Sequence, residues 1–192
     1  MPGTHTWISL STNCNEATGI CSERFLPIHE FGHNLGLNHA GNAAGQYTDG
    51  FDAMGCCNTA MTSNIHRAFL GWIPPAQVVT VTAPTTLTVT RAMDPTSSVY
   101  RVADGTDYYY LENRGERTVW ENGAGEAWPG GMLLIRVAPD YTIPAITTLL
   151  DLNPNTSPTW VGLPVGSSYT TPNGVTITNQ AFDGVNNTVA VT

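Results

Sequence analysis

The chain has 192 residues, enough for one good-sized domain or two small ones. Its formal net charge is −8 and it contains no lysine, which argues against a basic nucleic-acid-binding face. No apolar run reaches the roughly 20 residues that a membrane-spanning helix needs, so we expect no membrane span. Only 11% of the residues are charged, and Thr, Gly and Pro are abundant, which favours many short strands and turns over a helical bundle.

Residues 1–24 are polar and turn-rich, with no amphipathic period. They contain Cys14 and Cys21, and the other two cysteines are the adjacent Cys56 and Cys57. No C-x-x-C spacing occurs, so a cysteine-bound zinc ion is poorly supported. Two disulfides joining the first two cysteines to the adjacent pair would suit an oxidising compartment, and free buried thiols are the alternative.

A helix is expected from about residue 26 to residue 36, with Pro27 in its first turn, where a missing N–H removes no hydrogen bond. The stretch 29–39 reads H-E-F-G-H-N-L-G-L-N-H. Residues four apart lie on one face of an α-helix, so His29 and His33 can bind one metal ion together. Glu30 directly follows the first histidine, which places its carboxylate beside the metal, as a general base for the attacking water.

Gly36 is expected to end this helix, because glycine readily adopts positive φ, and to return His39 to the same ion as a third ligand. Three histidine ligands leave the fourth position of a zinc ion open, as in catalytic rather than structural sites. The predicted cofactor is therefore Zn²⁺ and the predicted reaction is hydrolysis. An H-E-x-x-H sequence alone also occurs in packed cores, and an intact but inactive zinc site stays open as an alternative.

Residues 38–61 are expected to form a loop, and residues 62–71 a short helix with Thr62 or Ser63 as its N-cap. His66 lies on this helix, where a packing or surface position is favoured over a role in orienting substrate. Oxygen-rich turns suit calcium, but no D-x-D-x-D loop is present, so calcium binding is left open without a supporting motif. The acidic residues considered for calcium are Asp49, Asp52, Asp151 and Asp183.

After residue 75 the chain consists of short alternating segments separated by turn residues. About seven such strands predict an antiparallel sandwich or a barrel-like domain. The expected strands are 78–82, 86–90, 99–102, 108–112, 132–137, 175–178 and 188–191. Glu112 and Arg114 lie two apart on one of them, share a face, and are expected to pair with each other or with neighbours in a structural role.

The long histidine motif, followed by Met54, resembles the metzincin clan of zinc endopeptidases, in which a methionine turn lies beneath the metal as a hydrophobic base. Met54 matches that methionine and is not expected to be a ligand. Many metzincins carry a tyrosine two residues later, where this chain has Cys56. The blocks 46–55 and 64–73 are similar to the gametolysin family, where a Y-x-D-x-x-D-x-M-G turn precedes a helix ending in L-G-W.

Weaker blocks at 109–114, 131–136 and 149–154 are similar to gametolysin-like and immune-inhibitor-A-like secreted proteases. The resemblance implies an α+β fold, in which a partial metzincin catalytic subdomain is followed by an antiparallel β-sandwich-like domain. The partial subdomain comprises the zinc helix, the Met-turn and the short helix. We accordingly divide the chain into a catalytic region, 1–74, and a β-rich domain, 75–192.

The resemblance further implies a secreted zinc endopeptidase that cleaves extracellular proteins or peptides. Zinc would be held by His29, His33 and His39, with Glu30 as the base. The residues before His29 are too few for the upper subdomain of metzincins, whose edge strand pairs with substrate, and they show no signal-peptide pattern. We therefore expect a fragment or mis-started frame of a longer protease.

A different class of function is a surface- or carbohydrate-binding module, in which the β-rich domain makes the contact and the zinc site is not catalytic. Neither the bond specificity nor the oligomeric state can be read from the sequence.

Overall fold

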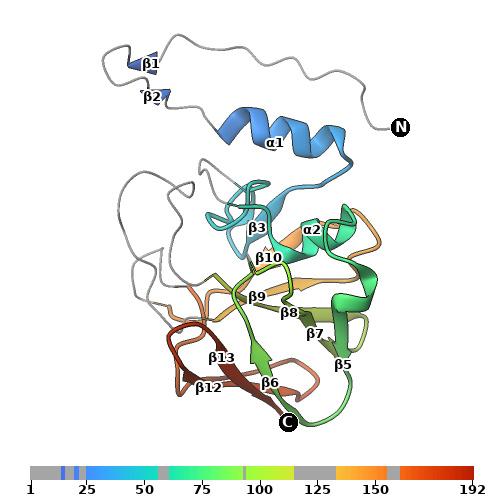
Figure 1. Ribbon diagram of the computed structural model, residues 1–192, viewed down its shortest axis with the longest axis vertical. Helices are drawn as coiled ribbons and strands as arrows, with labels where there is room; N and C mark the ends of the chain where they lie inside the picture. The colour runs from blue at the N-terminus through green and yellow to red at the C-terminus, as the bar shows by residue number, and fades with distance from the viewer. Residues whose placement is uncertain are drawn as a thin grey trace.

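The structure is a computed structural model, shown in Figure 1. It describes residues 14–15, 20–21, 25–55, 61–92, 94–114, 133–154 and 161–192. These residues form a mixed α+β structure made mostly of β-sheet with few helices, which confirms the predicted class. None of the helices in this part of the chain is long and apolar enough to cross a membrane.

The larger sheet has seven strands in the order β4-β3-β10-β9-β8-β7-β5. Its strands are β3 (Ala40–Asn42), β4 (Gly45–Gln46), β5 (Val78–Val81), β7 (Val99–Asp104), β8 (Asp107–Asn113), β9 (Leu133–Ala138) and β10 (Thr147–Leu149). The pairs β3–β10 and β5–β7 are parallel, so the sheet is mixed, and the expectation of a purely antiparallel domain is wrong. The chain leaves this sheet after β5 and crosses to the other sheet before β7, which lets β7 return in the same direction.

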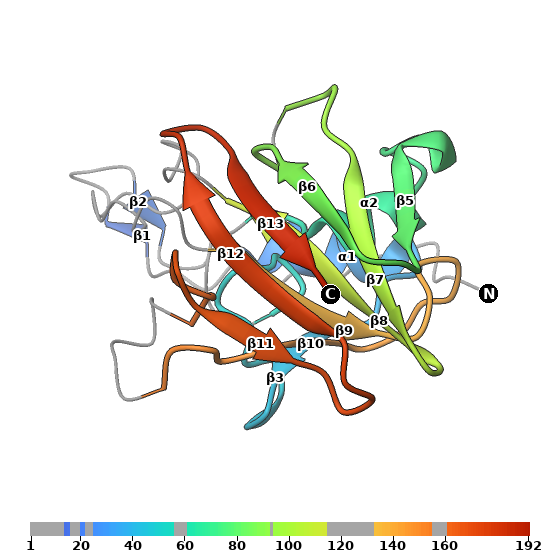
Figure 2. The same ribbon diagram turned by 90° about the horizontal axis from the view of Figure 1, so that it is seen from below.

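The smaller sheet has four antiparallel strands in the order β11-β12-β13-β6. Its strands are β6 (Thr85–Val89), β11 (Ser168–Thr170), β12 (Thr176–Phe182) and β13 (Asn187–Val191). Figure 2 shows this sheet lying across the larger one. Alternate residues of β13, including Val189, are buried and meet Leu111 and Leu133 of the larger sheet, so the main core lies between the two sheets.

All seven strands expected from apolar alternation are present, as β5 to β9, β12 and β13. Strands β3, β4, β10 and β11 were not expected, because each has only two or three residues and carries no alternating pattern of its own. Since β3 and β4 join the same sheet as β5 and β7 to β10, one sheet runs through both parts of the chain.

The helix expected around the histidine motif is present as α1 (Phe25–Asn34). It ends two residues before Gly36, whose φ of 92° turns the chain as expected. The short helix is α2 (Asn64–Phe69), and its N-cap is Ser63, whose hydroxyl accepts the His66 N–H. A 3₁₀ turn, η1 (Pro75–Gln77), leads into β5. Helix α2 packs Ile65 and Ala68 on Val99 and Tyr110, covering the face of the larger sheet opposite the main core.

Near the N-terminus, β1 (Cys14–Asn15) and β2 (Ile20–Cys21) pair antiparallel and bring the backbones of Cys14 and Cys21 opposite each other. The proposed disulfides to Cys56 and Cys57 lie outside the described residues.

Candidate metal centre

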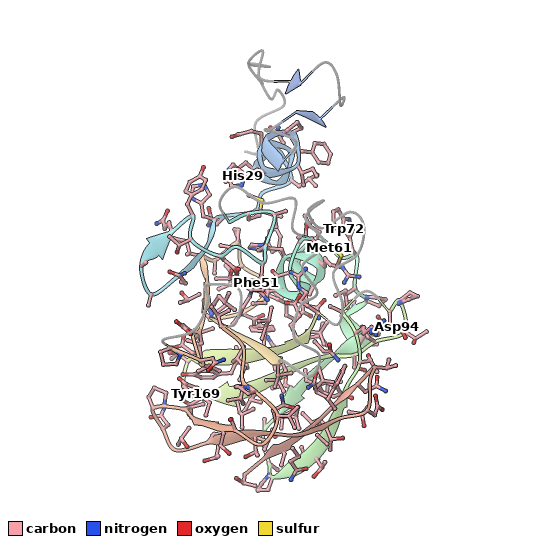
Figure 3. All side chains as sticks on the ribbon, turned by 90° about the vertical axis from the view of Figure 1, so that its left-hand side faces the viewer. His29, Phe51, Met61, Trp72, Asp94 and Tyr169 are labelled. Atoms are coloured by element: carbon pink, nitrogen blue, oxygen red, sulfur yellow. The ribbon has the colours of Figure 1, made fainter. Side chains whose placement is uncertain are left out.

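Three histidines from two segments meet at one point, with His29 on the side of α1 that faces the rest of the molecule (Figure 3). Nε2 of His33 lies 3.1 Å from Nε2 of His29 and 3.1 Å from Nε2 of His39. Two nitrogens bound to one tetrahedral zinc ion would lie about 3.3 Å apart. The structure therefore brings together the three residues that the sequence predicts as ligands, at a separation that suits a shared ion.

The opposite nitrogen of each ring is held by a hydrogen bond to an oxygen. Nδ1 of His29 donates to the Ala53 carbonyl at 3.0 Å, and Nδ1 of His33 donates to the Leu37 carbonyl at 2.9 Å. Nδ1 of His39 donates to Oε1 of Gln46 at 3.3 Å. A proton on each Nδ1 leaves the lone pair on each Nε2, so all three lone pairs are available at the shared point, as metal binding requires.

His29 is the most deeply placed of the three, with 1% of its surface exposed. Burial lowers its pKa below the ordinary histidine value, and the neighbouring His33 and His39 add to this, whereas the Ala53 carbonyl and the charge of Glu30 oppose it. A lowered pKa keeps the imidazole neutral at neutral pH. The neutral form is the one that binds a metal ion.

Met54 lies against the middle of α1. A Cβ placed on Gly32, which lies between His29 and His33 on the helix, would be 2.3 Å from Sδ of Met54. The methionine is 1% exposed and packs with Leu37 and Ala40, and its carbonyl accepts the Ala40 N–H at 2.9 Å. Met54 therefore contacts α1 and also fixes the segment that carries His39.

Glu30 lies on α1 directly after His29, partly buried. It does not belong to the histidine group, which among the described residues is the one set of three or more His, Cys, Asp or Glu side chains placed to hold an ion. Its charge still acts on His29. The sequence-based expectation of a carboxylate beside the metal, rather than on it, is compatible with this position.

Tyr47 is a member of the site that the sequence interpretation missed. Its hydroxyl lies 3.2 Å from Nε2 of His29, and its ring lies against those of His29 and His39. The metzincin pattern places a tyrosine two residues after the methionine, where this chain has Cys56, whereas Tyr47 lies seven residues before Met54. The signal was nevertheless present, because Tyr47 opens the Y-x-D-x-x-D-x-M-G block.

Gln46, which holds His39, was also missed. It is the last residue of β4 and directly precedes Tyr47, so both residues reach the site through the short hairpin that β3 and β4 form.

The family model of gametolysin peptidase M11 matches residues 1–107 of the chain. The chain belongs to the gametolysin peptidase family. This membership makes it a metallopeptidase, a class that acts on proteins or peptides and whose metal is usually zinc, and the match includes α1, the Tyr47–Met54 loop and α2. No curated protein and no solved structure matches the chain.

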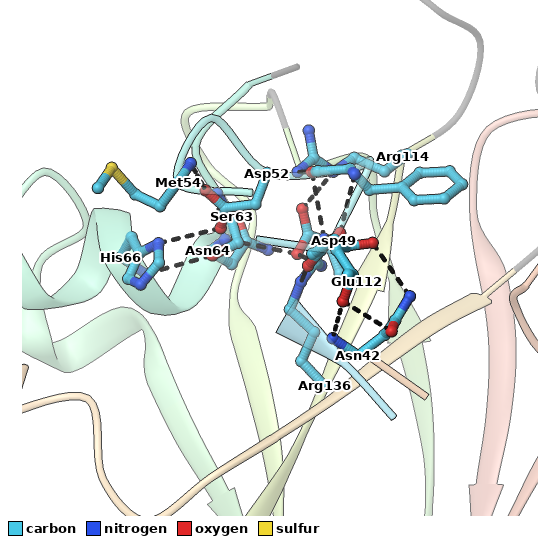
Figure 4. Close-up of polar contacts among 12 residues, drawn as sticks. Asn42, Asp49, Asp52, Met54, Ser63, Asn64, His66, Glu112, Arg114 and Arg136 are labelled. Carbon is cyan, nitrogen blue, oxygen red and sulfur yellow. Dashed lines mark hydrogen bonds and ion pairs between the residues drawn. The ribbon is translucent and has the colours of Figure 1, made fainter. Parts of the chain in front are cut away.

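In this gametolysin family member, the loop between Tyr47 and Met54 is held by a buried ionic network (Figure 4). Arg136 of β9 has no exposed surface, and its Nε lies 2.9 Å from Oδ2 of Asp49. Its guanidinium also donates to Glu112 of β8 and to the Phe51 carbonyl. Burial lowers the pKa of Arg136, but the charges of Asp49, Glu112 and Asp52 raise it by more. The net pKa is above the ordinary arginine value, so the guanidinium stays charged.

The predicted partnership of Glu112 and Arg114 is confirmed, since Nε of Arg114 pairs with Oε1 of Glu112. Arg114 also donates to the carbonyls of Phe51 and Met61. Arg136 of β9 and Arg114, which directly follows β8, therefore both hold the backbone of the loop through the Phe51 carbonyl.

Asp52 is the second anchor of the loop. One carboxylate oxygen accepts the Met54 N–H at 2.8 Å, while the other accepts the Ser63 N–H at 3.1 Å and lies 3.0 Å from Nδ1 of His66. Burial raises the pKa of Asp52, but the charge and hydrogen bond of His66, then Arg136, then the Met54 N–H lower it more, so the pKa lies below its ordinary range.

These contacts bear on two expectations from the sequence, the role of His66 and the carboxylates considered for calcium. His66 is a buried packing residue that pairs with Asp52 and is not part of the histidine group, as the sequence favoured. The carboxylates of Asp49 and Asp52, considered for calcium, are bound by Arg136 and His66.

Proposed function

We propose that this member of the gametolysin family is a zinc-dependent endopeptidase of the metzincin type, which hydrolyses peptide bonds of extracellular proteins. His29, His33 and His39 are the proposed ligands and Glu30 is the proposed general base. One observation carries the proposal most directly: three Nε2 atoms converge while each Nδ1 is held by an oxygen acceptor. Family membership supplies the peptidase activity to which this arrangement is assigned.

The histidines would hold the ion through Nε2, and the Ala53, Leu37 and Gln46 oxygens keep each ring turned toward the shared point. When bound, zinc supplies a Lewis acid that polarises the scissile carbonyl and activates water for attack. The Glu30 carboxylate takes a proton from the attacking water and passes it to the nitrogen of the leaving amine. In this proposal a half-buried carboxylate suits the role, because it can reach both water and substrate.

Met54 serves in this proposal as the Met-turn residue, which supports the site without binding the ion. Its contact with Gly32 favours that role, since Met54 supports α1 between its two histidines. We also propose that the protein is secreted. Residues 1–74 form the catalytic part and residues 75–192 the β-rich part, whose strand β10 pairs with β3 beside His39.

The test combines zinc analysis with peptide cleavage. We expect the wild-type chain to retain about one zinc ion after dialysis and to cleave an unstructured protein substrate. Glu30→Gln should keep the zinc and lose at least about 100-fold in cleavage rate, within the usual range for general-base catalysis. Asp107→Asn, which changes an exposed carboxylate at the start of β8, is the matched control and should retain both zinc and activity.

His33→Ala should lose the zinc as well as the activity. A wild-type chain that holds no zinc would overturn the metal site. Bound zinc with no cleavage would favour the non-catalytic alternative, in which the β-rich part is a surface- or carbohydrate-binding module.

A further inference from the structure

Tyr47 brings a phenol oxygen to the point where the three histidine nitrogens meet. Its hydroxyl lies 3.2 Å from Nε2 of His29, and that nitrogen is also 3.1 Å from Nε2 of His33. The tyrosine ring centre is 5.0 Å from that of His29 and 3.9 Å from that of His39. The oxygen therefore lies next to one donor atom of the group, while the ring rests against two of the three donor residues.

The backbone of Tyr47 is held in a conformation that tyrosine rarely adopts. Its φ is 70°, and it is the one non-glycine residue with positive φ among the residues that the structure describes. Such a conformation is strained for a residue with a side chain and persists where the surroundings impose it, often at functional sites. Here Asp49, two residues later, is fixed by the buried Arg136, and Gln46, one residue earlier, is fixed to His39.

The hydrogen-bonding pattern shows what the hydroxyl does without a metal. Nδ1 of His29 donates its proton to the Ala53 carbonyl, so Nε2 can only accept, and the Tyr47 O–H donates to it. An ion bound to that nitrogen would occupy the lone pair that Tyr47 uses. The hydroxyl would then lose its acceptor and present its own oxygen lone pairs to the ion.

We propose that Tyr47 is a fourth protein ligand of the metal centre, bound through its phenol oxygen when substrate is absent. The proposal rests on the proposed three-histidine zinc site and adds a donor that the histidine motif does not contain. Tyr47 is 41% exposed, so an incoming substrate can reach its side chain and displace it. Displacement restores the open position that a catalytic zinc site needs.

The test uses the copper(II)-loaded full chain, because a tyrosine oxygen bound to copper produces a charge-transfer absorption band that histidine ligands alone do not produce. We expect this band in the wild-type protein and its loss in Tyr47→Phe, a variant that keeps the ring packing. Tyr100→Phe, on β7 and packed against the core between the sheets, is the matched control and should keep the band.

Zinc affinity, measured by competition with a chromophoric chelator, is the second readout, and Tyr47→Phe should weaken it by about tenfold or more. A wild-type copper protein without the band, or a Tyr47→Phe variant with unchanged band and affinity, would overturn the tyrosine ligand while leaving the histidine site intact. If the wild-type chain bound neither copper nor zinc, the tyrosine ligand and the proposed function would both fail.

Discussion

Arg136 and Asp49 form an ion pair that has no contact with solvent on either side, with 2.9 Å between Nε and Oδ2. Arg136 lies on β9 in the middle of the larger sheet, and Asp49 lies in the loop that carries Tyr47 and Met54. The pair therefore joins the metal-centre loop to the most buried part of the fold. Charged residues buried this deeply are uncommon unless they are fully paired.

Removing the arginine should destabilise the protein strongly. Arg136→Met leaves Asp49 and Glu112 without their shared cation, and we expect the free energy of unfolding to fall by about 3–5 kcal/mol, as for other broken buried pairs. Arg101→Met is the matched control, because Arg101 pairs with Asp140 in a partly exposed position and stacks on Tyr108. Its loss should be about 1–2 kcal/mol.

Denaturant unfolding of the two variants measures this difference. Equal losses of unfolding free energy in the two variants would show that the buried network stabilises the fold no more than the Arg101–Asp140 pair does.

The second prediction concerns the acid stability given by Asp52. The pKa of Asp52 is lower in the fold than its ordinary value, so its contribution is complete above the unfolded value and is lost as the pH falls toward the folded one. The free energy of unfolding of the wild type should therefore decline from about pH 5 downward. Asp52→Asn should be less stable at pH 7 and should show a shallower decline in unfolding experiments between pH 7 and pH 3.

A slope as steep as that of the wild type would mean that other carboxyl groups govern the acid transition.

The third prediction concerns Gln46, whose Oε1 accepts the Nδ1 proton of His39. Gln46→Ala frees the ring to rotate and to change its tautomer, so zinc affinity should fall by about tenfold, the lower end of the usual range because the contact is exposed and 3.3 Å long. Gln77→Ala is the control, since Gln77 donates only a long bond to the Pro95 carbonyl in an exposed turn. Competition with a chromophoric chelator would give both affinities, and indistinguishable values would remove Gln46 from the site.

The fourth prediction concerns the contact between Gly32 and Met54. A Cβ at position 32 would lie 2.3 Å from Sδ of a methionine that is fully enclosed, so Gly32→Ala must displace one of the two segments. We expect a net loss of about 1–3 kcal/mol in stability, although alanine is the better helix former. The double variant Gly32→Ala with Met54→Val should lose less than the sum of the single variants.

Strict additivity in thermal or denaturant unfolding would show that the two residues do not compete for the same space.

The parts of the site that sequence predicts are those whose geometry is local. The helical spacing of His29 and His33, and the turn at Gly36 that returns His39, depend on residues that are close in the chain. The larger strands could be predicted for the same reason, since alternation within each strand reflects its own two faces.

What could not be predicted depends on partners far apart in the sequence. Strand β3 has three residues and no alternating pattern, and its parallel neighbour β10 lies within the β-rich region, with Thr147 paired to Ala40, 107 residues earlier. An arginine such as Arg136 is ordinarily expected at the surface, and its burial depends on pairing with Asp49 and Glu112, which come from two other segments of the chain. Tyr47 contacts His29 only because the β3–β4 hairpin folds back over α1's histidines.

The strands β3 and β10 pair in parallel although the ribosome synthesises them at well separated times. Asn38, beside the third histidine, donates to the carbonyl of Pro144, which is 106 residues further along the chain. At a translation rate of 5–20 residues per second, the ribosome synthesises that partner about 5–20 seconds after Asn38. All three histidines are therefore synthesised several seconds before β10, the strand that pairs with β3 beside His39. The nascent chain contains its proposed metal donors before it contains the strand that flanks them.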